Sequence, residues 1–474
     1  MNIKKKKSFE LIIEKINYYK LILLIIFFFV KFYYNKRIKF FNSEIIENYS
    51  KINLDLNLNL FKNLNKKINL GVYSFGLKNG GRARLTSILI NSLYNIQIIN
   101  IDGFNKICLF TILSIQDKEY LIPKDTKRMV IKKNSLNYLN KIISKNKIDI
   151  LIYNLNSEKE INFLNCKIFP KIIYYQHTSF FYMMYYNYTS FLSLYEAYQK
   201  SKYIVSLIPL ENNYIFNFWG ISSYLMNSFV TYEYNSVIPS NLMSKTILMI
   251  GRGNDKYKRF ILGVNAMEYI MKENTECEMK IISNMNYDLQ NKIYNLNLEE
   301  HIKFIGFTLI PEIHFENASL HIFPTISESF GLVLSETKIY GIPNILVGLD
   351  YVQISQGGTI IIYDDSPESI AKESIKIMKD ENYRKYLGKS ARNSMKKFNN
   401  RILYHKWVNL ILSIYNGDIF YSKLKNQEKK LNENDLIKSL EIQIKLLQKR
   451  VKHFYNISIN DFKNFSNLYK FQMK

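Results

Sequence analysis

Two glutamates, Glu328 and Glu336, have the spacing that points most directly to chemistry. They lie in the segment from Leu320 to Leu346, where a buried-strand pattern leads into a small polar turn with Glu328 and then an apolar helical pattern with Glu336. Positions eight residues apart are separated by a little over two helical turns, so both reach one ligand only if Glu328 lies on the turn before the helix. A long ligand with one carboxylate at each end would suit this geometry, and the alternative is a chance spacing.

A cluster of cations follows a second strand pattern, which ends at Gly251. Arg252, Lys256, Lys258 and Arg259 occupy the transition from that strand to the next helical pattern. A guanidinium group forms forked contacts with phosphate and an ammonium group acts as a point charge, so this cluster could neutralise a diphosphate without a metal. The alternative is a solvated basic loop in a lysine-rich chain.

A glycine pair, Gly80-Gly81, separates a strand pattern that begins at Ile68 from a helical pattern that begins at Leu85. Paired glycines let backbone amides approach a ligand without obstruction by Cβ atoms, and the end of the following helix adds positive potential. Alone the signal is weak, because a Gly-Gly turn is more often only a turn.

The elements that must position these residues alternate along the chain from Ile68 to about Asn416. Short apolar, β-branched runs alternate with helical patterns, which is typical of parallel sheets buried on both faces. Strand-like runs occur at 149–154, 171–176, 202–207, 246–251 and 278–283. These are too many for one compact sheet, so we predict an α/β protein with two Rossmann-like, doubly wound domains.

The segment around the two glutamates resembles the E(x7)E region of retaining GT-B glycosyltransferases of the family 4, group 1 type. Four other segments resemble further motifs of that family and come in the family's order. They are residues 79–84, YYQHTS around His177, 249–260 and 302–307. The resemblance runs from Ile68 to Tyr415. In the E(x7)E region it is carried by Glu328, Phe330, Gly331, Leu332, Val333, Glu336, Gly341 and Pro343.

The resemblance implies a UDP- or GDP-sugar donor held between the two domains, with no cofactor and no metal. Glu336 would hydrogen-bond the ribose hydroxyls, while Arg252 and Lys258 would hold the diphosphate and stabilise charge on the departing nucleotide. Lys256 is the alternative to Lys258. Breaking the sugar–phosphate bond releases a diphosphate, so donors aimed at this leaving group should contribute much of the rate.

The remaining implied roles concern the sugar and the phosphates. Glu328, together with the backbone amides of Phe330, Gly331 and Leu332, would address the donor sugar and phosphate. His177 would lie near the reacting sugar, with a satisfied structural histidine as the alternative. The Gly80-Gly81 loop would close over the phosphates.

This chain also departs from the family pattern near the second glutamate. Ser329 replaces the usual glycine, and Thr337-Lys338-Ile339 replaces an alanine-rich continuation. Arg259 stands where glycine is common. We expect the helix to form, with its close packing altered.

Both ends of the chain differ in character from its middle. Apolar residues at 18–34, flanked by lysines and arginines, predict a short uncleaved membrane anchor, with a buried or interfacial helix as the alternative. A heptad-like seam from Ile437 to Phe454 predicts a short coiled coil that could form an oligomer, or an amphipathic helix packed on its own protein. The predicted divisions are an N-terminal segment at 1–40, a linker at 41–66, an acceptor domain at 67–240, a donor domain at 241–398, a closing helix packing back on the first domain at 399–416 and a charged tail at 417–474.

Composition excludes several classes of protein. Hydrophobic residues make up 47% of 474 residues, which rules out a wholly disordered chain. The net charge of +25 reflects lysine spread along the whole length, so we expect no nucleic-acid partner. The 3 cysteines form no CxxC pair and favour a reducing compartment. We expect membrane association with a cytosol-facing catalytic domain, and a lumenal one is the alternative.

The leading interpretation is a hexosyltransferase-like enzyme that moves a sugar, with retention, to an unknown glycan, lipid-linked glycan or protein acceptor. A sugar-nucleotide epimerase is one alternative, because a shared fold does not fix chemistry. A non-catalytic membrane or scaffold protein of the same fold is another.

Overall fold

The computed structural model describes residues 67–417, with internal gaps, and the predicted anchor and linker and nearly all of the predicted tail lie outside this range. Within the described part, no helix is both long and apolar enough to span a bilayer. The gaps are residues 79, 99–103, 116–118, 132–135, 155–170, 180–197, 199–202, 210, 213–222, 253–255, 274–275, 285 and 350–351.

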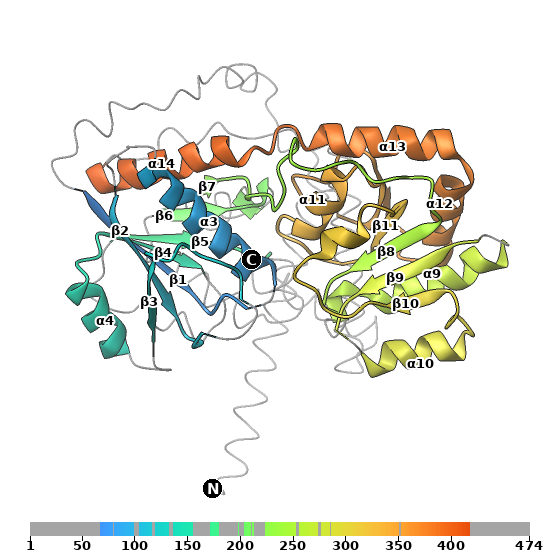
Figure 1. The fold of residues 1–474 in the computed structure, drawn as a ribbon, viewed down its shortest axis with the longest axis horizontal. Helices are drawn as coiled ribbons and strands as arrows, with labels where there is room; N and C mark the ends of the chain where they lie inside the picture. The colour runs from blue at the N-terminus through green and yellow to red at the C-terminus, as the bar shows by residue number, and fades with distance from the viewer. Residues whose placement is uncertain are drawn as a thin grey trace, which may run out of the picture.

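The first domain is built on a parallel sheet with the strand order β3-β2-β1-β4-β5-β6-β7 (Figure 1). β1 and β4 are buried along their whole length, as expected for strands covered on both faces. The strands are β1 Ile68–Ser74, β2 Phe104–Thr111, β3 Lys127–Val130, β4 Ile150–Asn154, β5 Lys171–Tyr175, β6 Tyr203–Ser206 and β7 Tyr224–Leu225.

The second domain repeats this plan with the order β10-β9-β8-β11-β12-β13, again with parallel pairs throughout. The predicted architecture of two parallel-sheet α/β domains is therefore confirmed. The strands are β8 Thr246–Ile250, β9 Glu278–Ile282, β10 Ile302–Phe304, β11 Leu320–Phe323, β12 Asn344–Val347 and β13 Thr359–Ile362.

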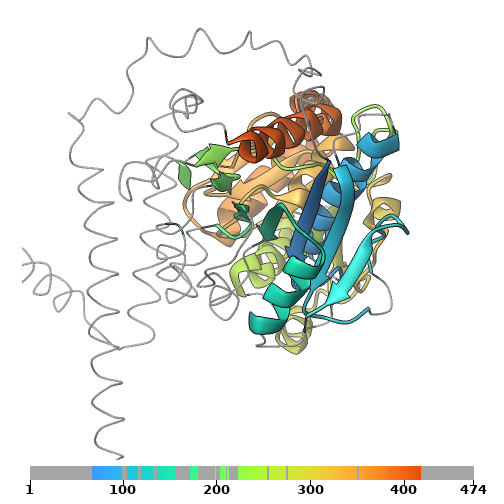
Figure 2. The same cartoon turned by 90° about the vertical axis from the view of Figure 1, so that its left-hand side faces the viewer.

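The helices cover both faces of the two sheets (Figure 2). Several begin where a short polar side chain accepts a backbone N–H, as Ser366 does from Ser369 and Asn399 from Arg401. The helices are α3 Gly81–Ile98, α4 Leu136–Lys145, α9 Phe260–Lys272, α10 Tyr287–Asn295, α11 Leu332–Ile339, α12 Pro367–Lys379, α13 Glu381–Ser394 and α14 Asn400–Asn416, with 3₁₀ turns at Lys256–Lys258 and Pro311–His314.

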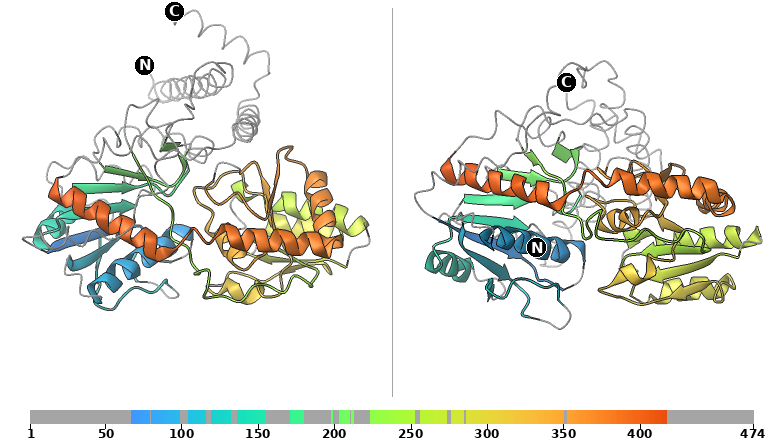
Figure 3. Two further views of the ribbon diagram at one scale, coloured as in Figure 1. Left: turned by 90° about the horizontal axis from the view of Figure 1, so that it is seen from above. Right: turned by 45° about the horizontal axis from the view of Figure 1, so that its top comes forward.

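Helix α14 follows the second domain in sequence but lies on the first (Figure 3). Trp407 is fully buried and meets the Tyr175 ring edge-on, with the ring centroids 4.9 Å apart. Lys171 Nζ donates to the carbonyl oxygens of Ile414 at 2.6 Å and Tyr415 at 2.9 Å, which places a cation at the negative end of the helix. These contacts tie the end of the second domain to the first sheet.

One apolar cluster continues from the first sheet through α14 into α11 of the second domain. It contains Leu85 and Leu89 of α3 as well as Phe330 and Leu334 beside and within α11. The two domains therefore share buried surface next to the E(x7)E segment.

Candidate functional site

Three of the predicted site segments follow the strands at which the strand order reverses. In the first sheet this reversal lies between β1 and β4, and in the second between β8 and β11. Ligands of open α/β sheets bind beyond the carboxyl ends of strands at such switch points. The Gly80-Gly81 turn, the Arg252 loop and the Glu328 turn therefore occupy the positions that the fold favours for a ligand.

Glu328 and Lys258 form an ion pair that joins the turn after β11 to the turn after β8. Their side chains are only 16% and 13% exposed. The Lys258 ammonium also lies 5.2 Å from the ring centroids of Phe323 and Tyr257. The role of Lys258 toward a diphosphate, with Lys256 as the alternative, remains a prediction.

Arg252 lies on the same loop as Lys258 but is exposed. Its Nη2 donates to the Tyr257 hydroxyl at 2.5 Å. The loop therefore offers one exposed guanidinium and one half-buried ammonium at the carboxyl end of β8.

Glu336 is almost completely buried in α11 and pairs with Arg84, which comes from α3 of the other domain. The same oxygen, Oε1, accepts from the Thr231 hydroxyl at 2.7 Å. The other oxygen, Oε2, is buried and has no hydrogen-bond partner among the described residues. Burial of Arg84 disfavours the charge of its guanidinium, but the nearby Glu336 carboxylate favours it. The pKa of Arg84 is therefore raised above its ordinary value.

A buried carboxylate oxygen without a donor is costly, so Oε2 of Glu336 is an acceptor available to a ligand hydroxyl. The predicted ribose contact of Glu336 fits this atom.

His177 follows β5 in the first domain and contacts the Glu328 turn of the second. Its backbone carbonyl accepts from Ser329 Oγ at 2.6 Å, and Ser179 Oγ hydrogen-bonds Ser327 Oγ next to it. Its imidazole Nε2 lies 3.2 Å from Asn154 Oδ1. Burial, and to a smaller degree the Arg82 cation, lowers the pKa of His177 to about 3, so the ring is neutral.

The N-termini of α3 and α11 approach each other across the domain boundary. Gly80 has a φ of +91° that favours glycine. A Cβ atom on Gly81 would lie 3.1 Å from Leu332 Cδ1 of α11, so glycine avoids a tight contact between the two helices here. Both helix ends direct free N–H groups toward this region, which favours anions.

Phe330 and Gly331 build the turn into α11. The Phe330 ring is buried and meets Phe398 edge-on at 5.5 Å, so it belongs to the shared core and only its backbone can face a ligand. Gly331 precedes the helix with a φ of +84°. The helix predicted after this pair is confirmed as α11.

The departures from the family pattern have structural explanations. Ser329 supplies the hydroxyl that bonds His177. Lys338 is fully buried and donates to the carbonyl oxygens of Ile354 and Gln356, each at 2.6 Å. Arg259 has a φ of +50°, a conformation in which glycine is at ease, and it forms an ion pair with Asp365.

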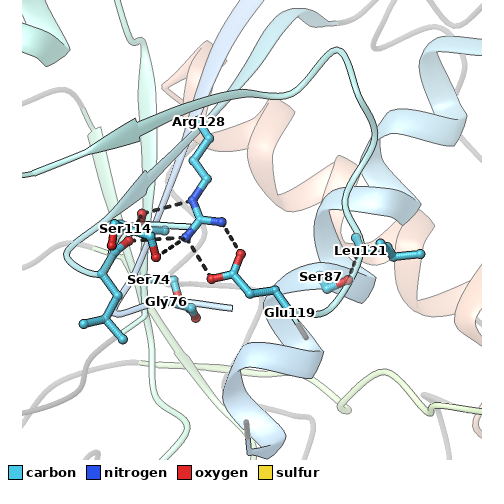
Figure 4. A network of polar contacts seen from close by, with 9 residues as sticks. Ser74, Gly76, Ser87, Ser114, Glu119, Leu121 and Arg128 are labelled. Carbon is cyan, nitrogen blue, oxygen red and sulfur yellow. Dashed lines mark hydrogen bonds and ion pairs between the residues drawn. The ribbon is translucent and has the colours of Figure 1, made fainter. Parts of the chain in front are cut away.

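A second polar network supports the loop between β2 and β3 (Figure 4). The guanidinium of Arg128 pairs with Glu119, and its Nε donates to Thr111 Oγ1 at 3.2 Å. Farther along this loop, the Tyr120 ring centroid lies 5.2 Å from Arg84 Cζ. The network thus steadies the loop that borders Arg84.

Sequence reasoning missed Arg84, Thr231 and Asn154 as members of this constellation. Arg84 lies within the glycine-turn motif at 79–84. A cationic side chain next to a predicted ligand loop could have indicated its role in the site. No motif in the sequence around Thr231 or Asn154 indicates a functional site. For metals, no group of three His, Cys, Asp or Glu side chains within the described residues could hold an ion, and the absence of a metal requirement remains a prediction.

The match to a known protein family falls almost entirely on the second domain. Residues 232–394 match the family model of glycosyl transferases group 1. No curated protein matches the chain.

Three solved structures similar to this fold are 12–13% identical in sequence. A sucrose-phosphate synthase from Thermosynechococcus elongatus has a TM-score of 0.62 at 13% identity, covering 74% of this chain and 100% of its own. An Anabaena protein in complex with UDP and glucose has a TM-score of 0.58 at 12% identity, covering 73% and 99%. A TarM mutant from S. aureus in complex with Fondaparinux, α-GlcNAc-glycerol and UDP has a TM-score of 0.55 at 13% identity, covering 73% and 99%.

The two parallel-sheet domains, with the Gly80-Gly81, Arg252 and Glu328 segments at their switch points, have the GT-B fold. Residues 232–394 therefore match a group 1 glycosyl transferase domain, which together with the fold supports a glycosyltransferase enzyme.

Proposed function

We propose that this chain transfers a sugar from a UDP- or GDP-sugar, with retention of anomeric configuration, to a glycan, lipid-linked glycan or protein acceptor. The observation that carries the proposal is the buried Oε2 of Glu336, which has no donor in the described part of the chain and lies where the two domains meet. A ribose hydroxyl supplies the missing donor. The UDP named with two of the similar structures supports a uridine nucleotide.

The diphosphate of such a donor would lie between the N-termini of α3 and α11, within reach of Arg252 and Lys258. The bond between the anomeric carbon and the phosphate oxygen breaks, and its electron pair leaves with the diphosphate. The helix N–H groups and the two cations stabilise this developing negative charge, which is the largest contribution expected in a site of this kind. Neither contribution uses a metal.

The sugar itself would lie near Glu328 and His177, which Ser329 brings together across the domain boundary. The neutral imidazole can exchange hydrogen bonds with sugar hydroxyls without adding a positive charge beside the cationic transition state. The acceptor would approach from the first domain, nearly all of which lies outside the residues that match the family model.

Membrane association through residues 18–34, with the catalytic domains facing the cytosol, belongs to the same proposal, and a lumenal location is its alternative. The tail beyond residue 417 would provide any oligomer contact. Truncation before Ile68 tests the anchor, because the shortened chain should leave the membrane fraction and keep its activity.

The test of donor binding is a thermal-shift series with UDP-, GDP- and ADP-sugars, using free sugars and nucleotides as controls. Ligand at 100 times its Kd should stabilise the protein by about 2.7 kcal/mol. Glu336→Ala should abolish this ligand-induced shift, whereas Glu299→Ala, at an exposed glutamate of the second domain, should retain it. The ligand-induced shift is compared within each variant, because Glu336→Ala also leaves Arg84 without its partner.

Transfer is tested with Arg252→Ala, which should slow it by more than ten-fold, about 1.4 kcal/mol of lost transition-state stabilisation. Normal activity in both Glu336→Ala and Arg252→Ala would overturn the site assignment. Conversion of the sugar nucleotide without any acceptor would identify an epimerase, and no response to any nucleotide sugar would favour the scaffold alternative.

A further inference from the structure

A chain of buried polar groups leads from α3 to His177 in the first domain. Thr86 on α3 is 1% exposed and Asn154 at the end of β4 is completely buried. Asn154 Nδ2 lies 2.9 Å from Thr86 Oγ1, and Asn154 Oδ1 lies 3.2 Å from His177 Nε2. The proposed transfer reaction does not use Asn154 or Thr86 directly, so their burial in a polar chain needs another explanation.

The position of each proton along this chain follows from the donors and acceptors available. The Thr86 hydroxyl has one proton, which it donates to the Arg82 carbonyl at 3.0 Å or toward Ser74 Oγ at 3.5 Å. A carbonyl oxygen can only accept, so the contact with Arg82 uses the one Thr86 proton, and Thr86 then accepts from the Asn154 amide nitrogen. Asn154 Oδ1 then faces His177, and Nε2 of the imidazole must be the protonated nitrogen.

The other imidazole nitrogen, Nδ1, therefore carries a lone pair. This atom is buried and finds no hydrogen-bond partner among the residues the structure describes. The Tyr175 ring lies against the imidazole, with ring centroids 4.0 Å apart, and the Ser329 hydroxyl of the second domain holds the His177 carbonyl. The ring is thus fixed in plane and placed beside the Glu328 turn.

We propose that Asn154, oriented by Thr86, is a positioning residue that fixes His177 in the Nε2–H tautomer and so presents Nδ1 as a hydrogen-bond acceptor to a hydroxyl of the bound sugar. The inference rests on the proposed function for the identity of the ligand, but the tautomer itself is a property of the free protein. The low pKa of His177 agrees with a neutral ring at physiological pH. Arg82 is the charged group that contributes to that shift.

The first experiment is NMR of the full chain labelled with ¹⁵N-histidine, with the His177 signals assigned by their loss in His177→Gln. We expect a protonated Nε2 and an unprotonated Nδ1, unchanged between pH 8 and pH 5. A protonated Nδ1 would overturn the proposal. This result does not depend on finding a substrate, so failure of the proposed function and failure of this inference can be told apart.

The second experiment compares Thr86→Val with Thr86→Ser. Valine removes the acceptor that orients Asn154, whereas serine keeps a hydroxyl. Thr86→Val should mix the two tautomers and lower kcat by about ten-fold, with little change in the affinity for free UDP. Thr86→Ser should keep the single tautomer and most of the activity, and equal losses of activity in both variants without a change of tautomer would contradict the proposal.

The third experiment uses the pH profile of Asn154→Asp. The new carboxylate can still accept from Nε2–H, so the tautomer survives, but its charge raises the pKa of His177. Protonation of Nδ1 would then remove the acceptor, so activity should fall on the acid side at a higher pH than in the wild type. Asn146→Asp, at another buried asparagine of the first domain, is the matched control and should leave the profile unchanged. An Asn154→Asp profile identical to that of the control would contradict the proposal.

Discussion

At the residue scale, each acidic group of the E(x7)E pair is held by a cation from a different part of the chain. Glu328 pairs with Lys258 of its own domain, whereas Glu336 pairs with Arg84 of the other domain. An ion pair that is largely withdrawn from water gives little net stability, but removing one partner leaves a buried charge uncompensated. The Arg84–Glu336 pair therefore orients Glu336 and joins the domains at the same point.

Replacing Arg84 with methionine should destabilise the protein by about 3 kcal/mol, because Glu336 would remain buried without its cation. The double variant Arg84→Met with Glu336→Gln should recover part of that loss, since no buried charge then remains. The measurement is the free energy of unfolding in urea for both variants. Arg401→Met, at an exposed arginine of α14, is the control, and a loss no larger than that of the control would show that Arg84 does not compensate Glu336.

At the element scale, the site depends on two helices that begin next to each other. The N-termini of α3 and α11 lie close together, at a point where a Cβ atom on Gly81 would come 3.1 Å from Leu332 Cδ1. The left-handed φ of Gly331 turns the chain into α11 immediately after the Glu328 turn. Glycine at these two positions leaves room for the contact between the helices and allows the turn.

Gly81→Ala should therefore weaken donor binding about five- to ten-fold, because the added methyl group forces the helices apart and overpacking costs about 1–3 kcal/mol. Leu332→Ala in the same chain should restore affinity by making room, since only the backbone of Leu332 is proposed to face the donor. Isothermal titration with UDP or the UDP-sugar measures this. If Leu332→Ala fails to rescue Gly81→Ala, the loss has a cause other than crowding between the helices.

At the scale of the whole molecule, the two domains are joined by one apolar cluster, by α14 and by polar contacts around the site. Two histidines with lowered pKa values, His177 and His321, link this folded state to pH. Burial lowers the pKa of His177 to about 3 and that of His321 to about 4, and the Lys258 cation also lowers the latter. Unfolded histidine takes up a proton near pH 6.5, so the unfolded state binds more protons than the folded state between pH 6.5 and pH 4.

Stability should consequently fall as the pH is lowered from 6.5 to 4, by up to about 1.4 kcal/mol per pH unit for each of these histidines. Thermal unfolding between pH 7 and pH 4.5 measures the slope. His321→Gln should make the slope shallower by removing one of the two groups, while the melting temperature at pH 7 falls because the hydrogen bond with Asn344 is altered. An unchanged slope in this variant would mean that His321 titrates normally in the folded state.

The sequence by itself determined the parallel α/β class, the two domains and the place of each candidate loop at a strand end, because burial on both faces and glycine turns leave local patterns. It also predicted Glu328, Arg252 and Lys258 in turns after strands and Glu336 within the following helix, and the structure has them there. Only the tertiary structure decided that Arg84 pairs with Glu336 and that Asn154 faces His177. Such contacts join residues far apart in sequence, and their energy depends on distance and burial in the folded chain, which no local pattern records.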